Sequence, residues 1–544
     1  MQAAADSSQD RAPATARPVV DRPFALAAGL ALAATCAVLW LAGWQTRGWI
    51  SAWPRFQDDA YYYLVIAQNA AGGHGFTMDR LSPTNGFQPL WMWTLVPVAW
   101  LSGSDPAVFL GVVQVLSVAL VAAVGGVFCG LLRARLGLAP ALLAGLLIVF
   151  PRFLNVLVSG LESGLVFLVL VALIVELLRR DALSSPVPRA ADARTGALVG
   201  LLLLARLDTV FIGLALAGFV AAHGLMRGTG GFAARIARTV RKELALFWPT
   251  VALVTPYLVW NQLAFGHLMP ISGALKTSFP QAGFTPEHMR VEYAGLLLLG
   301  LGAAGREIWR GNGRDPLVRG VALLSIGLVF HALYTVMYMH WAVFSWHFAA
   351  FIPVGILGAA MLASDAARRA PRVFVIGALA GLALFQVFAL AFSVSRLALS
   401  FTVAGREAGA WVAANLPADA VLGMKDSGAF SYFAQRRVMN LDGVANSFEF
   451  ANALCHGGLE DFMRSHGVEY VAQHSVPPEV RAGAYERFTQ TYRCHLPGGR
   501  DASLELRRDL EVFRGTAYID EQAEPDQLLI WRLPDASAPA TPAG

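Results

Sequence analysis

The stretch that decides the fold of this chain spans residues 56–93 and opens with Phe56-Gln-Asp-Asp-Ala-Tyr-Tyr-Tyr63. It continues through Gly72-Gly-His-Gly-Phe-Thr77 and Ser82-Pro-Thr-Asn-Gly-Phe-Gln-Pro-Leu-Trp91. Asp58 and Asp59 directly follow the first long apolar segment, and carboxylates beside a bilayer are either well solvated or functional. Because the aromatic, amphipathic residues behind them suit an interface, the stretch predicts a site held at a membrane surface.

The composition indicates a polytopic membrane protein with one soluble portion. The chain has 544 residues, of which 56% are hydrophobic and 15% are charged, and its mean hydropathy is +0.52. Soluble globular domains are usually about a quarter charged. The formal net charge of +5 comes with Arg residues in short clusters between apolar segments, which is typical of topology signals. We therefore expect no nucleic-acid partner.

Apolar segments recur along the first 393 residues, and a membrane span needs roughly 20 mostly apolar residues. The segment 87–103 is also apolar, but Pro89 and Pro97 interrupt it, and we expect it to be embedded or interfacial. We expect about eleven spans, at residues 23–44, 106–132, 137–157, 160–178, 195–207, 209–226, 244–264, 291–309, 317–338, 349–364 and 373–393.

The distribution of Lys and Arg predicts the orientation. With the N-terminus inside, the inner loops carry roughly three times as many Lys and Arg residues as the outer loops. Counting 87–103 as a full span would reverse this bias. We therefore expect a disordered cytoplasmic tail at 1–22, a membrane module at 23–393 whose first outer loop is 45–105, and an outer C-terminus.

After residue 393 the sequence changes character. A helical pattern at 403–415 is followed by short strand-like runs at 420–424, 437–441, 468–473 and 528–533. Alternation of the two patterns predicts a small α/β domain at 394–533 outside the membrane, followed by a disordered tail at 534–544. Cys455 and Cys494 both fall in this domain, where an oxidising compartment permits a disulfide, although the sequence leaves the pairing open.

These features together resemble the GT-C superfamily of polytopic glycosyltransferases, which use lipid-phosphate-linked sugars on the outer side of a membrane. The 56–93 stretch is similar to a bacterial branch related to cell-wall arabinofuranosyltransferases and protein O-mannosyltransferases. The resemblance extends to Ser159-Gly-Leu-Glu162, Arg206-Leu-Asp208 and Asn440-Leu-Asp-Gly-Val-Ala-Asn446. Relatives carry an Arg-Tyr pair beside a late span, whereas this chain has Trp346-His347-Phe348.

The resemblance implies the chemistry of the acidic pair. Transfer from a polyprenyl-phosphate sugar needs a carboxylate base for the acceptor hydroxyl and cations for the departing phosphate. Asp58 matches the catalytic Asp of the superfamily, with Asp59 directly behind it. The two carboxylates also suit a divalent cation such as Mg, Mn or Ca. Alternatively, the pair caps the helix that follows, where acidic side chains are favoured.

Further candidates for substrate binding surround the predicted site, and each has a structural alternative. His74 contacts substrate or occupies a glycine turn, and Lys276 binds lipid phosphate or reaches to headgroups. Arg206 faces phosphate or pairs with Asp208, and His347 replaces the Arg of relatives or is structural. The remaining candidates bind sugar or serve as helix caps and solvated loop ends, and they are Thr84, Asn85, Gln88 and Glu162.

The sequence thus predicts an integral-membrane glycosyltransferase in the inner membrane of a bacterium. It is expected to move a sugar from a polyprenyl-phosphate donor to a glycan, glycolipid or protein acceptor of the cell envelope, in contact with membrane lipids. Two alternatives stay open: a transporter or lipid flippase, in which intramembrane charges would line a pathway, and a non-catalytic scaffold that binds glycans.

Overall fold

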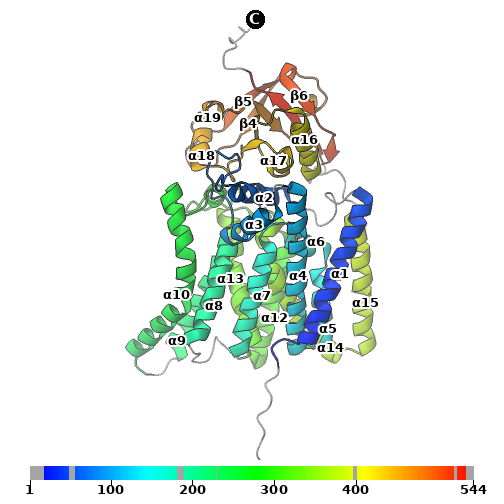
Figure 1. Cartoon of the computed structure of the whole chain (residues 1–544). Helices are drawn as coiled ribbons and strands as arrows, with labels where there is room; N and C mark the ends of the chain where they lie inside the picture. Colours follow the sequence, from blue (N-terminus) through cyan, green and yellow to red (C-terminus); the bar gives the residue numbers. More distant parts are fainter. Residues whose placement is uncertain are drawn as a thin grey trace, which may run out of the picture.

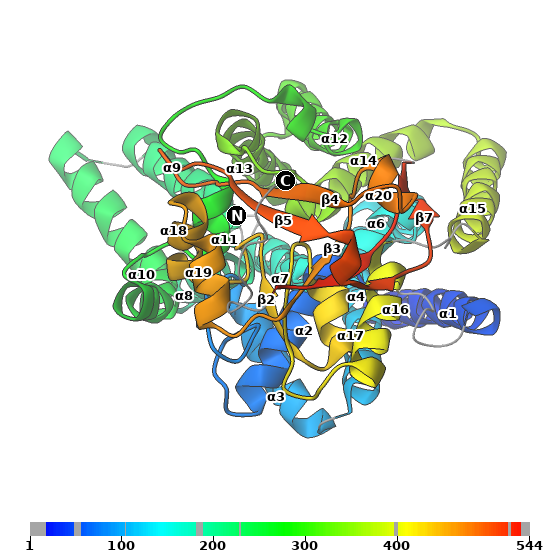
Figure 2. The same ribbon diagram turned by 90° about the horizontal axis from the view of Figure 1, so that it is seen from above.

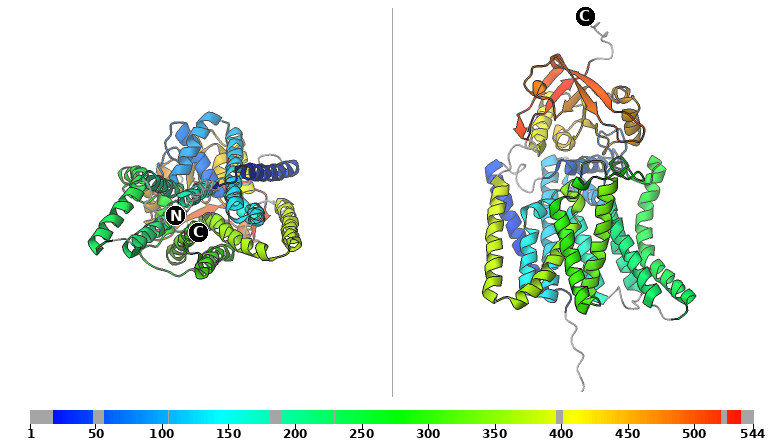
Figure 3. Two further views of the ribbon diagram at one scale, coloured as in Figure 1. Left: turned by 90° about the horizontal axis from the view of Figure 1, so that it is seen from below. Right: turned by 180° about the vertical axis from the view of Figure 1, so that it is seen from behind.

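Long helices stand side by side in a bundle, and a small α/β domain covers one end of it (Figure 1). The computed structural model describes residues 18–47, 56–103, 105–180, 189–227, 230–395, 401–519 and 524–534. The expected tails at 1–22 and 534–544 lie almost entirely outside these residues. Figure 3 shows the same arrangement from behind and from below.

The bundle helices follow the apolar segments of the sequence. Several begin at a capping residue: Asp105 accepts the Ala107 N–H at 2.8 Å to start α4, and Asp315 accepts the Leu317 N–H at 2.7 Å to start α13. The helices are α1 (Arg22–Arg47), α4 (Pro106–Leu136), α5 (Leu138–Ile148), α6 (Pro151–Leu157), α7 (Ser163–Arg180), α8 (Arg189–Ala205), α9 (Val210–Arg227), α10 (Phe232–Phe265), α12 (Val291–Glu307), α13 (Pro316–Tyr338), α14 (Phe351–Arg369) and α15 (Arg372–Ser395).

Among the described residues, seven helices are long and apolar enough to cross a membrane, and the bent pair α5–α6 makes up to eight. The other three expected spans coincide with α7, α8 and α12. These three helices are not among the seven. Helix α7 contains the charged residues Glu176, Arg179 and Arg180, and α8 and α12 have only 17 residues each. The chain is therefore a multi-pass membrane protein, while the count of eleven spans stays a prediction.

Short elements lie at the end of the bundle that carries the α/β domain, which we call the domain end. The acidic pair opens α2 (Asp58–Ala71), which lies across the bundle beneath the domain (Figure 1). The interrupted segment 87–103 forms α3 (Pro89–Ser102), with Pro97 inside the helix. The other short elements near this end are η2 (Leu207–Thr209), α11 (Ile271–Lys276), η3 (Pro286–His288) and η5 (Ser345–Phe348), whereas η4 (Ile308–Asn312) follows α12.

The C-terminal domain is built on a five-stranded sheet with the order β2-β1-β3-β9-β6. Strand β1 (Val421–Met424) pairs in parallel with β2 (Arg437–Asn440) and β3 (Tyr470–Gln473), and the antiparallel strands β9 (Leu529–Arg532) and β6 (Glu511–Arg514) complete the sheet. The four strands predicted from the sequence are β1, β2, β3 and β9, so the α/β prediction is confirmed.

Helices cover both faces of this sheet, which explains why β1 and β3 are buried along their whole length. One face packs on α16 (Phe401–Asn415) and α17 (Gly428–Ala434), and the other on α18 (Phe448–Cys455) and α19 (Leu459–Ser465). A disulfide joins Cys455 to Cys494. The remaining elements are α20 (Pro478–Arg481), β4 (Arg487–Tyr492), β5 (Ala502–Arg507), η6 (Arg508–Leu510), β7 (Tyr518–Ile519) and β8 (Pro525–Asp526).

Candidate active site

Asp58 joins the bundle to the C-terminal domain. Its two carboxylate oxygens accept the N–H groups of Gly428 at 2.9 Å and Ala429 at 2.8 Å, the first residues of α17. A Cβ at Gly428 would lie 2.0 Å from the Asp58 carbonyl oxygen, so only glycine permits this approach. Burial raises the pKa of Asp58 to about 8, against the two backbone hydrogen bonds, which favour the carboxylate.

Asp59 differs from Asp58 in its surroundings. In the described part of the chain, its carboxylate has no hydrogen bond and no ion pair. It lies between charged groups of both parts of the molecule. Burial raises the pKa of Asp59 to about 6; Lys276 opposes the shift, and Asp442, Asp426 and Glu162 add to it. Asp59 is therefore the carboxylate of the pair that remains available to a substrate.

Lys276 is the cation whose charge lowers the pKa of Asp59. It ends α11, and its Nζ lies 5.9 Å from the centroid of the Trp341 ring, with no carboxylate within 4 Å among the described residues. Asn85 holds α11 in place, because its Oδ1 accepts the Ile271 N–H at 2.9 Å while its Nδ2 donates to Asn261 Oδ1 at 3.1 Å. Asn85 thus positions Lys276, and its amide is occupied by protein groups.

Arg206 is held between two carboxylates. It is 5% exposed, donates to Glu162 through Nη1, and donates to Asp208 through Nε at 3.1 Å. His331 Nε2 lies 3.8 Å from Asp208. The ion pair predicted as one alternative for Arg206 and Asp208 is present, and Glu162 extends it to a buried triad. Because both carboxylates face one guanidinium, Arg206 offers little free positive charge to a phosphate.

Of the other predicted residues, three belong to this cluster and one, His74, lies outside it. His347 is 9% exposed in η5, where its Nδ1 accepts the Phe344 N–H at 3.2 Å; burial, Arg206 and Lys276 hold its pKa well below the usual range, so the ring is neutral. Gln88 accepts the Leu207 N–H at 3.3 Å, and Thr84 accepts the Gly86 N–H at 3.1 Å. His74 is exposed in a turn after α2 and is not part of this cluster.

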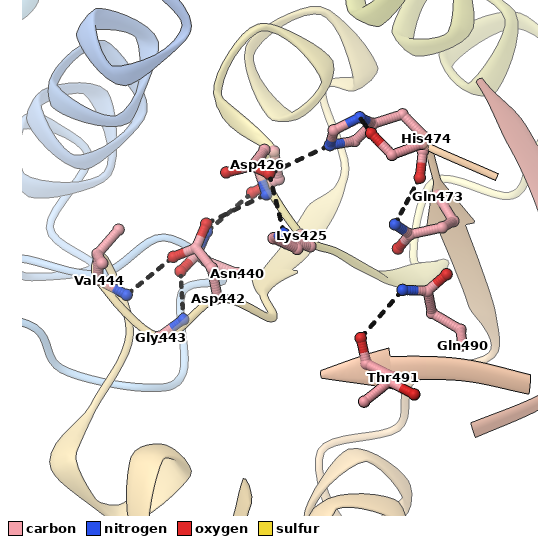
Figure 4. Close-up of polar contacts among 12 residues, drawn as sticks. Lys425, Asp426, Asn440, Asp442, Gly443, Val444, Gln473, His474, Gln490 and Thr491 are labelled. Atoms are coloured by element: carbon pink, nitrogen blue, oxygen red, sulfur yellow. Dashed lines mark hydrogen bonds and ion pairs between the residues drawn. The ribbon is translucent and has the colours of Figure 1, made fainter. Parts of the chain in front are cut away.

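The cluster contains groups that sequence reasoning missed. Asp426 and Asp442 follow the carboxyl ends of β1 and β2 and lie beside each other (Figure 4). The Tyr62 hydroxyl of α2 donates to Asp442 at 3.1 Å. His474 follows β3, and its Nε2 lies 3.1 Å from Oδ2 of Asp426. Burial lowers the pKa of His474, but carboxylate contacts such as this one raise it to about 9. The only sequence signal was the 440–446 motif, which contains Asp442.

A divalent cation does not fit this arrangement well. Among the described residues, no group of three or more His, Cys, Asp or Glu side chains could hold a metal. Both oxygens of Asp58 accept backbone N–H groups, which would compete with a metal for this carboxylate.

An apolar cavity of about 930 Å³ lies between α9 and α13, and we call it the α9–α13 groove. Phe211 and Phe330 line it toward the domain end, and Met226 and Arg314 line it toward the opposite end. The Phe211 ring lies 6.1 Å from that of His331, which contacts the Arg206 triad. Phe211 thus connects one end of the groove to His331 and, through it, to the Arg206 triad.

Sequence comparison identifies one domain and no relative of known function. The profile of a domain of unknown function (DUF8728) matches residues 397–517, which covers most of the C-terminal domain. No curated protein matches the chain in sequence.

Solved structures resemble the chain over most of its length. The apo oligosaccharyltransferase of Archaeoglobus fulgidus aligns with a TM-score of 0.50 at 12% identity, over 88% of this chain and 74% of that chain. ArnT from Cupriavidus metallidurans bound to undecaprenyl phosphate aligns with a TM-score of 0.49 at 14% identity, over 88% and 97%. The archaeal enzyme AglB with an inhibitory peptide and dolichol phosphate gives 0.46 at 13%, over 89% and 74%. The likeness to the apo oligosaccharyltransferase shows that this chain has the fold of the GT-C glycosyltransferases, as the sequence resemblance predicted.

Proposed function

We propose that this protein transfers a sugar from a polyprenyl-phosphate donor to an acceptor of the bacterial cell envelope, at the domain end of the bundle. The proposal takes this end to face outward across the inner membrane, with the N-terminus inside. The observation that carries it is the placement, on the GT-C fold, of a carboxylate and a cation that act on each other electrostatically, Asp59 and Lys276, neither of which has an ion-pair partner within 4 Å among the described residues.

Asp59 is the proposed general base. A base needs a free lone pair directed at the acceptor hydroxyl and a pKa near or below the working pH. At neutral pH Asp59 has the required pKa, about 6, and among the described residues no hydrogen bond or ion pair occupies its oxygens. Asp58, which the superfamily pattern favoured, has a pKa of about 8 and binds α17. We assign Asp58 the task of fixing Asp59 under the C-terminal domain.

Lys276 is the proposed partner of the departing phosphate. An ammonium group without a carboxylate partner stabilises charge that develops on the leaving oxygens, which lowers the barrier in a site shielded from water. The neutral His347 adds a hydrogen-bonding group beside it. A single displacement in which Asp59 accepts the proton of the acceptor hydroxyl as the sugar leaves phosphate would invert the anomeric centre.

The α9–α13 groove is the proposed site of the polyprenyl chain. It is lined mainly by apolar side chains, and Phe211 at one end of it contacts His331, which lies 3.8 Å from Asp208. A chain lying there would present its phosphate to the charged cluster from the membrane. The carboxyl edge of the β1–β3 sheet would then approach the acceptor from the opposite side.

The test uses purified protein in lipid nanodiscs and a panel of polyprenyl-phosphate sugars, with release of polyprenyl phosphate as the readout. Turnover of one donor, dependent on an added envelope acceptor, is the expected result. Binding of polyprenyl phosphate sugars without any release, together with their movement between leaflets, would instead support a flippase.

A further inference from the structure

A second apolar groove is lined by residues of α14 and α15, among others. These two helices lie on the side of the bundle away from α9 and α10 (Figure 2). The groove has a volume of about 600 Å³ and is bounded by α5, α6, α12, α14 and α15, and we call it the α12–α15 groove. Phe153, Leu298, Leu362 and Leu382 line it. It shares no lining residue with the α9–α13 groove, so the donor proposed above does not account for it.

The groove is open because α15 stands apart from the bundle. Only 6% of the apolar window of α15 is buried, compared with 67% for the neighbouring α14. On the opposite wall, Leu298 of α12 is 66% exposed. Apolar surface of this kind at membrane depth faces lipid chains, and a gap between two helices holds such chains in a defined place.

Two arginines lie at the end of the groove nearest the C-terminal domain. Glu292 lines the groove there, and its Oε1 lies 3.3 Å from Arg152 Nη1 and 3.4 Å from Arg290 Nε. Two guanidinium groups around one carboxylate leave a net positive charge. Their side chains are 49% and 37% exposed, so both are accessible to a headgroup phosphate.

Gln386 supplies a further polar group in the wall of the groove. The residue is 2% exposed, and its Nε2 donates to the Leu146 carbonyl at 3.3 Å. Its Oε1 has no hydrogen-bond partner among the described residues. An unsatisfied amide oxygen in an apolar wall is costly, and a donor on a bound molecule would remove that cost.

We propose that the α12–α15 groove binds an anionic phospholipid from the leaflet next to the C-terminal domain. Arg152 and Arg290 hold its phosphate, the apolar walls hold its acyl chains, and Gln386 is the acceptor for a hydroxyl of the lipid. Charge complementarity to the two arginines selects this occupant over a neutral lipid. The proposal does not depend on the transferase reaction.

A lipid bound in this groove would act on the candidate active site through the hydrogen bond between Arg290 and Ser345. Arg290 Nη1 donates to Ser345 Oγ at 3.1 Å, and Ser345 begins η5, which contains His347. A phosphate that fixes Arg290 would therefore also fix the segment that carries His347.

Native mass spectrometry of the detergent-purified protein titrated with phosphatidylglycerol tests the proposal. Gly295 lines the groove, and a Cβ placed there meets nothing within 4 Å, so Gly295→Leu starts from an open position and is designed to obstruct the groove. Gly305→Leu is the matched control, because Gly305 lies in the same helix, outside the groove lining, and is equally open.

The expected result is retention of phosphatidylglycerol by the unaltered protein and by Gly305→Leu, and loss of it by Gly295→Leu. The pair Arg152→Gln and Arg290→Gln should weaken binding by about tenfold or more, since charge-assisted hydrogen bonds are lost. Equal retention by Gly295→Leu, or equal binding of phosphatidylcholine, would overturn the proposal. Titration with polyprenyl phosphate in parallel separates this outcome from a failure of the donor site.

Discussion

Asp58 and Gly428 are in contact although 370 positions separate them in the chain: the Asp58 carboxylate accepts the Gly428 N–H at 2.9 Å, and the two backbones approach until no Cβ fits. This contact places the first residue of α17 on the first residue of α2. Asp59, the next residue, thereby lies between the bundle and the sheet edge that carries Asp426 and Asp442.

The first prediction concerns this contact. Gly428→Ala should push α17 away from α2, because its Cβ would lie 2.0 Å from the Asp58 carbonyl oxygen, at a cost of about 1–3 kcal/mol. Limited proteolysis and thermal unfolding should show a loosened C-terminal domain. Gly302→Ala, where a Cβ meets nothing within 4 Å, is the control. Unchanged protease resistance in Gly428→Ala would show that the domain does not dock through this contact.

The second prediction is a pH profile. A base with a pKa of about 6 is active as the carboxylate, so kcat/KM should fall as the pH drops through about 6. Lys276 lowers the pKa of Asp59, and Lys276→Met should therefore move this acidic limb to higher pH. Lys242→Met removes a charge that acts on Asp192 and Glu243 rather than on Asp59, and should leave the limb in place. A limb near pH 8 in the unaltered protein would indicate Asp58 instead.

The third prediction separates a structural Arg206 from one that binds phosphate. Arg206→Gln should lower the free energy of unfolding by about 3–5 kcal/mol, because the buried Glu162 loses its partner. Arg368→Gln removes a pair in which the arginine side chain is 67% exposed, and should cost no more than about 1 kcal/mol. If Arg206→Gln kept full stability but lost donor binding, Arg206 would be a phosphate ligand.

The fourth prediction concerns the bond between Cys455 and Cys494, which are 39 positions apart. Replacing both by Ser should destabilise the C-terminal domain by about 3–4 kcal/mol in the chain-entropy model. Denaturant unfolding of this domain with and without reductant measures the effect. Cys36 and Cys129 are buried and unpaired in the bundle, so a reductant effect confined to the C-terminal domain identifies the bond. Identical unfolding under both conditions would contradict the prediction.

Local pattern predicted the elements well, because apolar length and alternation directly reflect burial. The bundle helices and the four strands that include β1 and β9 lie where the sequence indicates. Pro89 begins α3, whereas Pro97 lies inside this helix without ending it. The pairing of Arg206 with Asp208 was accessible for the same reason, since two positions separate the residues.

Contacts between distant segments were not accessible to the sequence. Nothing in the sequence around Asp58 or Gly428 indicates the other residue, so the hydrogen bonds that hold Asp58 could not be predicted. Likewise, Tyr62 binds Asp442 across 380 positions, and Asn85 bonds to Asn261 and Ile271. Each of these contacts depends on how the C-terminal domain and the α10–α11 segment pack against α2. Local sequence periodicity does not encode that packing.

The most direct test of the account compares Asp59→Asn with Asp58→Asn in the polyprenyl-phosphate release assay, with donor binding and protease resistance measured on the same samples. Loss of the base should reduce turnover by roughly 10²–10⁴-fold in Asp59→Asn while donor binding and domain docking persist. Asp58→Asn should loosen the C-terminal domain and retain more turnover than Asp59→Asn. Near-normal turnover in Asp59→Asn, with turnover abolished in an Asp58→Asn protein whose domain stays docked, would contradict the account and return the base to Asp58.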